Sequence, residues 1–297
     1  ISSNKSIKLA IGLILTGIYH RQARVDKKLP ILEFLNENIA DLANDEQKSV
    51  LLQLENVYRG RNEIAKAILV RNQRFNKNYV STFWEIYRDC GLFEAAINDF
   101  KLFQEKPKTI LSTSLYYWHL GNLFLDNNQV DSARKYYEFG LTNIKQHLRK
   151  AAKLTSFELI DAQYWRGNFM GDIAQCDFIV GKYANAIKPL LYDISYSEHN
   201  ATNKIYKSMI LADCYLKLNE VQNAKIYIDA VRFNSLQIMS QRDLLTLYRI
   251  SSLYFKKINQ YDSAFYFSEA YNKFSDTLSS RIQQGQSVLL LVNFEIN

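Results

Sequence analysis

The stretch 114-SLYYWHLGNLFLDNNQVDSARKYYEFGLTNIKQH-147 carries the clearest structural pattern in this sequence. Apolar residues recur at helical spacing in two runs, Leu115–Leu125 and Ala133–Ile144, and the polar residues 126–129 separate the runs. Small residues fall where the two helices would have to touch, and large aromatic residues surround them. The stretch therefore predicts two helices that pack against each other as a hairpin.

This hairpin resembles a tetratricopeptide (TPR) unit, a helix–turn–helix of about 34 residues. The matching small and large positions are Leu120, Gly121, Phe124, Ala133, Tyr137 and Gly140. The resemblance implies an all-α fold, a right-handed superhelix (α-solenoid) of stacked hairpins. It implies a scaffold that carries no chemistry of its own.

The same small-residue position recurs along the chain. The alanines that mark it are Ala96, Ala133, Ala186, Ala224 and Ala264, at separations of 37, 53, 38 and 40 residues. None of these equals 34, so we expect lengthened helices, with the largest insertion around Lys150–Trp165. We predict one TPR-like solenoid over residues 1–297, with degenerate repeats in 1–78, clearer repeats in 79–271 and a final linking helix in 276–297 that is loosened at Gly285.

Several classes of catalytic or metal site lack their sequence signature. The three cysteines Cys90, Cys176 and Cys214 form no CxxC pair, and the four histidines lack HxH or HxxxH partners. No glycine-rich phosphate loop or nucleophile elbow occurs, and the carboxylates are spread singly. The two glycines of 167-GNFMG-171 lie in a helical pattern and indicate close helix packing. We expect no catalytic residue, no metal and no cofactor in this chain.

The formal net charge of +7 is concentrated in one part of the sequence. Six cations between Arg59 and Lys77 accompany a single carboxylate, Glu63. Such a stretch is either a solvated helix face or a surface for nucleic acid or anionic headgroups. We favour the solvated face, so a nucleic-acid partner is not expected.

The two ends of the sequence suggest a part of a longer protein. The apolar run Leu9–Tyr19 is too short to span a bilayer and predicts a buried helix of the first repeat. The end, from Tyr271 through Asn293-Phe294-Glu295, resembles the end of TPR ectodomains in bacterial membrane sensor histidine kinases and related regulators. In those proteins a helix runs from the last repeat to a membrane span outside the present sequence.

The resemblance also implies which residues meet a ligand. In TPR proteins the first helix of each hairpin lines a concave groove. A side-chain amide there can donate to and accept from a peptide backbone. Ordinary contacts between repeats would explain the same residues. The predicted groove residues are Glu85, Arg88, Trp118, Asn122, Gln175, Phe178, Tyr206, Met209, Asp213, Arg249 and Leu253.

Three functions are compatible with these patterns. The first is a non-catalytic sensory domain on the periplasmic side of a bacterial inner membrane, binding a peptide or protein segment and possessing a C-terminal helix suited to a homodimer. The second is a cytoplasmic TPR scaffold or transcriptional regulator with the same kind of partner. The third is a binder of nucleic acid or an anionic surface through Arg59–Lys77.

Overall fold

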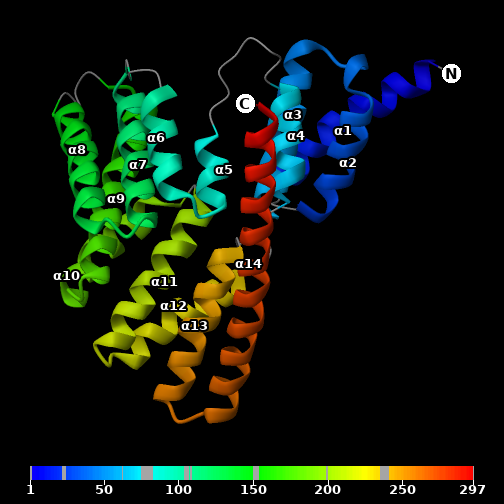
Figure 1. The fold of residues 1–297 in the computed structure, drawn as a ribbon. Helices are drawn as coiled ribbons and strands as arrows, with labels where there is room; N and C mark the ends of the chain where they lie inside the picture. The colour runs from blue at the N-terminus through cyan, green and yellow to red at the C-terminus, as the bar shows by residue number, and fades with distance from the viewer. Residues whose placement is uncertain are drawn as a thin grey trace. The chain divides into compact units, whose positions relative to one another are not determined.

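The structure is a computed structural model that describes residues 2–21, 25–61, 63–74, 83–103, 107, 109–149, 154–198, 200–234 and 241–296. In these ranges all the regular structure is helical (Figure 1). The chain divides into two compact units. Unit 1 comprises Ile1–Leu92 and Thr277–Asn297, and unit 2 comprises Phe93–Asp276.

Unit 1 is built on two helix pairs. Its elements are α1 (Ser2–Arg21), α2 (Val25–Glu37), the 3-10 turn η1 (Ile39–Asp41), α3 (Asn44–Gly60), α4 (Ile64–Arg74), α5 (Trp84–Asp89) and the C-terminal part of α14 (Tyr261–Ile296). The α1–α2 and α3–α4 pairs share one apolar core, in which Leu32, Leu35 and Leu54 are fully buried. Each helix contributes one apolar face to this core.

Helix α1 is only partly buried, which corrects the expectation for Leu9–Tyr19. Leu9 lies in the core, but Ile7, Ile11 and Ile14 are at least half exposed. They stand at i, i+4 and i+7 on the face opposite Leu9, because α2 covers one side of the helix only. Among the described helices none has the length and apolarity needed to cross a bilayer.

Unit 2 contains the clearer repeats. Its helices are α6 (Phe93–Phe103), α7 (Ile110–Asp126), α8 (Val130–Leu148), α9 (Ser156–Ile179), α10 (Tyr183–Tyr196), α11 (Ala201–Lys217), α12 (Val221–Asn234), α13 (Gln241–Lys257) and the first part of α14. Helices α7 and α8, α9 and α10, and α11 and α12 pair as hairpins, and each hairpin packs on the next (Figure 1). The core therefore extends along the stack instead of gathering at one centre.

One turn geometry recurs before every predicted alanine anchor. A residue with positive φ stands five positions before the alanine each time, as Gly91, Asn128, Gly181, Asn219 or Asn259. The amide after it donates to the carbonyl five residues back, as Gln129 does to Phe124 and Glu220 does to Tyr215. This is the Schellman ending of a helix, and glycine or asparagine suits its left-handed backbone. All five alanines are buried, which confirms the repeat register.

Close contacts between helices explain the small residues of the 114–147 stretch. A Cβ added to Gly121 would lie 2.3 Å from the ring of Tyr137, and a Cβ added to Gly140 would lie 2.2 Å from the ring of Phe169. The first contact joins α7 to α8, and the second joins α8 to α9. Glycine at each position lets a neighbouring ring fill the seam.

The predicted insertion around Lys150–Trp165 consists partly of extra helix. Helix α9 has 24 residues, whereas α7, α11 and α13 have 17 each. The extension begins at Ser156, with Thr155 as a capping residue whose side chain accepts from the Glu158 amide. The largest irregularity in the repeat spacing therefore places additional side chains, such as Phe157 and Asp161, at one end of α9.

The C-terminal segment is a continuation of the last hairpin. Helix α14 runs without a break from Tyr261 to Ile296, and its later residues belong to the core of unit 1. Gly285, expected to loosen this helix, instead lets it approach Cys90 and Ile64 closely. Gln286 Nε2 donates to the Cys90 carbonyl at 2.7 Å, and Leu289 is buried beside Ile64. The segment thus closes one side of unit 1.

Candidate functional site

Nine of the predicted groove residues lie in unit 2, on the first helix of successive hairpins. We call this set the first-helix row: Trp118 and Asn122 on α7, Gln175 and Phe178 on α9, Tyr206, Met209 and Asp213 on α11, and Arg249 and Leu253 on α13. The stack brings the row together: α11 contacts both α9 and α13, and Trp118 on α7 packs on Trp165 of α9 (Figure 1). Most row members contact one another or the second helices.

The α7 end of the row joins an aromatic cluster to a buried acid. The Trp118 ring packs edge-on against Trp165 at 6.0 Å between centroids, and its indole N–H interacts with the Asp172 carboxyl. Asn122 Oδ1 accepts from the hydroxyl of Tyr137 at 2.7 Å. These contacts hold both side chains in place while leaving each of them half-buried.

In the middle of the row, α9 and α11 are linked by a side-chain hydrogen bond. Gln175 Nε2 donates to the Tyr206 hydroxyl at 2.5 Å. Phe178, one turn further along α9, packs against Tyr183 with ring centroids 5.6 Å apart. Gln175 and Phe178 are both half-buried.

Toward α13 the row is more buried. Arg249 donates to Asp213 Oδ2 at 2.6 Å, and the Asp213 side chain is almost completely covered. Met209 is 2 % exposed and belongs to the core of unit 2. Its side chain therefore packs inside the protein and does not face a groove. Leu253 packs against the same core and is half-buried.

A buried charge cluster beside the row was not anticipated. Lys207 on α11 is fully covered and pairs with Asp172 on α9, while Asp193 Oδ2 on α10 lies 3.9 Å from its Nζ. Asp193 Oδ1 accepts from Ser197 and Asn203. The signal that could have revealed the cluster is a lysine inside the apolar run 205–216. Asp172 and Asp193, spread singly in the sequence, approach one lysine only through folding.

The electrostatics of this cluster follow from burial. Two carboxylates face one ammonium, so full ionisation would leave a negative charge in a dry environment. Burial raises the pKa of Asp193 to about 6, although Lys207 opposes the rise. Burial alone would lower the pKa of Lys207, but Asp172 and Asp193 outweigh it and raise that pKa. The lysine therefore stays charged while Asp193 holds its proton to unusually high pH.

Glycines 167 and 171 pack α9 against α10, as predicted for the GNFMG sequence. A Cβ on Gly171 would lie 2.1 Å from Asp193 Oδ2, and one on Gly167 would lie 3.4 Å from the Asp193 Cα. Gly171 thus makes room for the buried carboxylate. The close packing also keeps water away from it.

The two remaining groove residues, Glu85 and Arg88, belong to α5 in unit 1. Glu85 is part of a network of ion pairs. It binds Arg59 at 3.1 Å and Arg71 at 2.5 Å, while Arg71 also pairs with the fully buried Glu55. Arg88 is half-buried.

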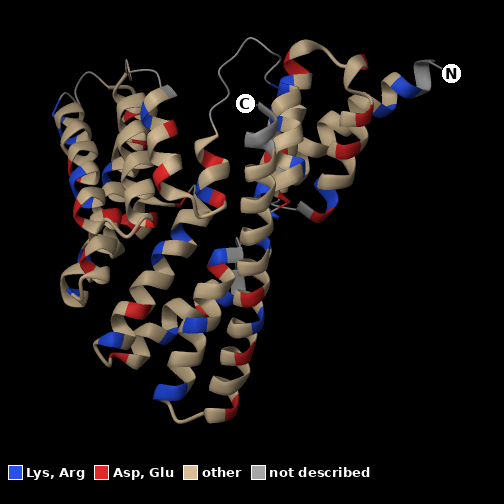
Figure 2. Cartoon of the chain, viewed as in Figure 1, with Lys and Arg blue, Asp and Glu red and all other residues tan. Residues whose placement is uncertain are grey.

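This network changes the interpretation of the basic stretch. Arg59 also pairs with Asp89 at 2.7 Å, Arg74 pairs with Glu55 at 3.1 Å, and Arg61 and Lys66 both pair with Glu63. The partners Glu55, Glu85 and Asp89 come from outside the stretch, on α3 and α5. Figure 2 shows acidic and basic positions together on α5. Lys77 lies outside the described residues, and every described cation of the stretch has a carboxylate partner.

The sulfur and metal chemistry of the described residues is limited. Cys90, Cys176 and Cys214 are free and buried, and burial raises the pKa of each thiol to about 12. In the ranges that the structure describes, no three His, Cys, Asp or Glu side chains are placed to hold a metal ion.

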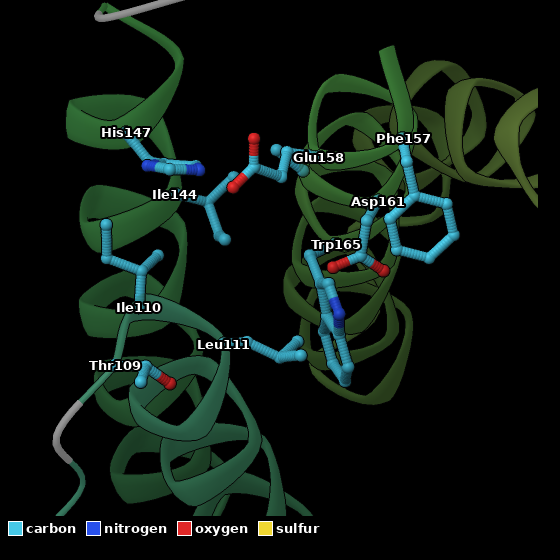
Figure 3. A pocket seen from close by; sticks show the side chains of 10 residues that line it. Thr109, Ile110, Leu111, Ile144, His147, Phe157, Glu158, Asp161 and Trp165 are labelled. Atoms are coloured by element: carbon cyan, nitrogen blue, oxygen red, sulfur yellow. The ribbon is translucent and has the colours of Figure 1, made fainter. Parts of the chain in front are cut away.

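A cavity opens in unit 2, and none of the residues of the first-helix row lines it. It has a volume of about 280 Å³ and lies between the N-terminus of α7, the C-terminal part of α8 and the extension of α9 (Figure 3). Its walls are mainly apolar, with Ile110, Leu111, Ile144 and Trp165 among them. Trp165 also packs on Trp118, so the cavity and the row share an aromatic wall.

Comparisons with known proteins place the fold. No family model matches the chain, and no curated protein matches it either. Among solved structures, it is similar to a Rap protein in complex with Competence and Sporulation Factor, at 14% sequence identity and a TM-score of 0.56, covering 91% of this chain and 77% of that one. It is also similar to a tetratricopeptide repeat protein from Parabacteroides merdae ATCC 43184, at 13% identity and a TM-score of 0.50, covering 94% and 99%. The predicted all-α solenoid of helical hairpins is confirmed.

Proposed function

We propose that this chain, which has the fold of the tetratricopeptide-repeat proteins, is a non-catalytic module that binds a peptide or protein segment along the first-helix row. The fold supports protein binding in general, since a Rap protein with a similar fold is seen in complex with Competence and Sporulation Factor. The assignment of the binding surface to this row is our proposal.

The observation that carries the proposal is the hydrogen bonding of two side-chain amides, each of which uses only one of its two polar atoms within the part of the chain that the structure describes. Asn122 uses its oxygen to accept from Tyr137, and its Nδ2 donates to no acceptor among the described residues. Gln175 uses its nitrogen to donate to Tyr206, and its Oε1 accepts from no donor there. The row therefore offers one fixed donor and one fixed acceptor, and a peptide backbone supplies the complementary pair.

The neighbouring side chains suit the same ligand. Trp118, Phe178 and Leu253 are half-buried and occupy equivalent sides of α7, α9 and α13. Half-buried aromatic and aliphatic groups beside fixed polar groups provide anchor sites for alternate side chains of a bound segment. Because hydrogen bonds to their neighbours already hold the amides in position, little side-chain entropy is lost when a ligand binds.

The binding proposal is tested by selecting peptides against the whole chain. A random peptide library displayed on phage is selected on the wild-type protein, and the best peptide is titrated by calorimetry. Asn122→Leu removes the free donor, and its matched control is Asn185→Leu at an exposed asparagine of α10. We expect micromolar binding that falls at least tenfold in Asn122→Leu only. Equal affinities for both variants would contradict the assignment to the first-helix row.

The cellular context is a second, finer proposal. We infer the periplasmic sensory part of a bacterial membrane signalling protein from the C-terminal resemblance, with a cytoplasmic scaffold or regulator as the alternative. A protease-protection assay on spheroplasts, with an epitope inserted in the full-length protein at an exposed turn such as Gly181–Lys182, separates the two. Digestion by external protease supports the periplasmic side, and protection until lysis contradicts it.

Oligomerisation is a separate part of that proposal. A sensor of this kind would pair through its C-terminal helix, where Leu290 and Leu291 are more than half exposed on α14. Sedimentation equilibrium of wild type and of the Leu291→Gln variant tests this. A concentration-dependent dimer that weakens in Leu291→Gln supports the pairing, and a monomer at all concentrations contradicts it.

A further inference from the structure

The cavity at the end of the α7–α8 hairpin has features of a recognition pocket. Its volume of about 280 Å³ stands near the lower end of ligand pockets, which begin at about 300 Å³. That space suits one long side chain better than a cofactor. The cavity exists because α9 is extended, since Phe157, Glu158 and Asp161 all come from the additional turns.

The walls of the cavity combine aromatic and aliphatic groups. Figure 3 shows Leu111 and Trp165 directed toward each other across the cavity, with Ile144 on the α8 side. The rim is unusually apolar for a surface, because Phe157 is 79 % exposed and Leu111 is 45 % exposed. Exposed apolar groups that surround a concavity are typical of a binding site.

Two carboxylates line the same cavity, and they differ in what they already bind. Glu158 Oε2 accepts from the backbone amide and the hydroxyl of Thr155, both at 2.8 Å, and so completes the cap of α9. Asp161 forms no hydrogen bond or ion pair with any described residue. Among the described residues, the ionisable group that acts on it is His147, on the opposite wall. Burial raises the pKa of the Asp161 carboxyl, and His147 lowers it.

We propose that this cavity binds the arginine side chain of a peptide partner, with its guanidinium on Asp161 and its aliphatic stem between Leu111 and the aromatic rings. A guanidinium fits both elements of the wall, because it stacks on an aromatic face and pairs with a carboxylate through parallel N–H donors. An ammonium makes a point contact only and is more strongly hydrated. Arginine is also enriched among anchor residues at protein interfaces.

The pocket extends the proposed function, because its Trp165 wall packs on Trp118 of the first-helix row. A segment bound along the row would therefore reach the pocket at the α7 end. The two sites nevertheless rest on different side chains. The pocket uses Leu111, Phe157 and Asp161, and the row uses its two amides, so each can fail without the other.

The test uses a single amino-acid probe, which is too small to depend on the row. N-acetyl-L-arginine amide is titrated into the full chain labelled with 5-fluorotryptophan, and the Trp165 signal is assigned with Trp165→Phe. Binding is expected at about millimolar affinity, as for a ligand of this small size. N-acetyl-L-citrulline amide, which has the same shape without the charge, should shift this signal little. An equal response to both probes, or to neither, overturns the proposal.

Two variants locate the contact. Asp161→Asn should weaken the arginine probe at least fivefold, whereas Asp131→Asn on the exposed first turn of α8 should not. Phe157→Ala removes a mostly exposed ring, so the protein should fold normally and the affinity should fall. Unchanged affinity in both pocket variants contradicts the assignment. The library-selected peptide and the Asn122→Leu variant report on the row separately, so loss there leaves the arginine titration intact.

Discussion

The ring of Tyr137 fills the space that a side chain on Gly121 would need, since an added Cβ would lie 2.3 Å from the ring. The contact joins the two helices of the hairpin that defines the repeat pattern. Tyr137 is itself fully buried, and its hydroxyl donates to Asn122 of the first-helix row. One seam thus connects the packing of a hairpin with the position of a proposed binding residue.

Substituting Gly121 by alanine should therefore destabilise unit 2. The Tyr137 ring cannot move without disturbing its neighbours, so we expect a loss of about 3 kcal/mol, as for an overpacked core. The matched control is Gly167→Ala, whose new Cβ would meet its nearest atom at an ordinary 3.4 Å. That variant should be unchanged or gain up to about 1 kcal/mol from the lower entropy of its unfolded chain. Urea unfolding measures both values, and equal stability would contradict the packing argument.

The turn between α7 and α8 depends on the left-handed backbone of Asn128, with φ of 57°. Asn128→Ala should cost about 1 kcal/mol, because a Cβ without a polar end disfavours this conformation. Asn128→Gly should cost nothing measurable, since glycine adopts positive φ freely.

Asn127, the preceding residue, provides the matched control for this turn. It has φ of −84°, so Asn127→Ala should change stability by less than about 0.5 kcal/mol. Thermal unfolding of the three variants measures these differences in stability. A loss in Asn127→Ala as large as that in Asn128→Ala would contradict the role of the positive φ.

The buried Asp193 should give unit 2 a characteristic dependence on pH. Because its folded pKa is raised to about 6 from an ordinary 3.8, the folded state binds the proton more tightly than the unfolded state. The resulting stabilisation is complete below pH 3.8 and is lost as the pH rises through about 6. Relative to Asp193→Asn, the wild type should lose up to about 3 kcal/mol between pH 4 and pH 7.

This pH prediction has its own control. Glu198 is exposed beyond the end of α10 and is not part of the Lys207 cluster, so Glu198→Gln should follow the wild-type curve in parallel. The free energy of unfolding is measured at intervals of half a pH unit for the three proteins. If the difference between wild type and Asp193→Asn stays constant across this range, the account of the Lys207 cluster is wrong.

In unit 1, the buried pair of Glu55 and Arg71 should be intolerant of losing one charge. Glu55→Gln leaves the guanidinium of Arg71 buried without its buried carboxylate partner, and we expect a loss of about 3 kcal/mol. Asp45→Asn, on the same helix but fully exposed, should leave the stability nearly unchanged. Urea unfolding followed by circular dichroism compares the two. A neutral effect of Glu55→Gln would show that the pair contributes little.

The sequence predicts the hairpins well because their physical signal is local. Small residues such as Ala133 and Gly121 stand at the positions where helices touch. Each turn lies at a fixed distance from the alanine that follows it. The same local pattern placed Trp118, Asn122 and Gln175 on first helices. Spacing alone could not show that Met209 is buried, since burial depends on how α11 is covered by its neighbours.

Local sequence patterns could not predict the ion pairs. Lys207 meets Asp172 and Asp193 from two other helices, and Arg71 meets Glu55 and Glu85 from two others again. Residues so far apart in the sequence become neighbours only after the hairpins stack. For the same reason the stretch from Arg59 looked unpaired when its carboxylate partners lay outside it.

The central claim, that a segment binds along the first helices of unit 2, is tested most directly by hydrogen exchange. Amide exchange of the full chain is followed by mass spectrometry with and without the library-selected peptide. The account predicts slower exchange in α7, α9 and α11, which carry Asn122, Gln175 and Tyr206, with no change in α10 and α12. Protection confined to α8, α10 and α12 would contradict it.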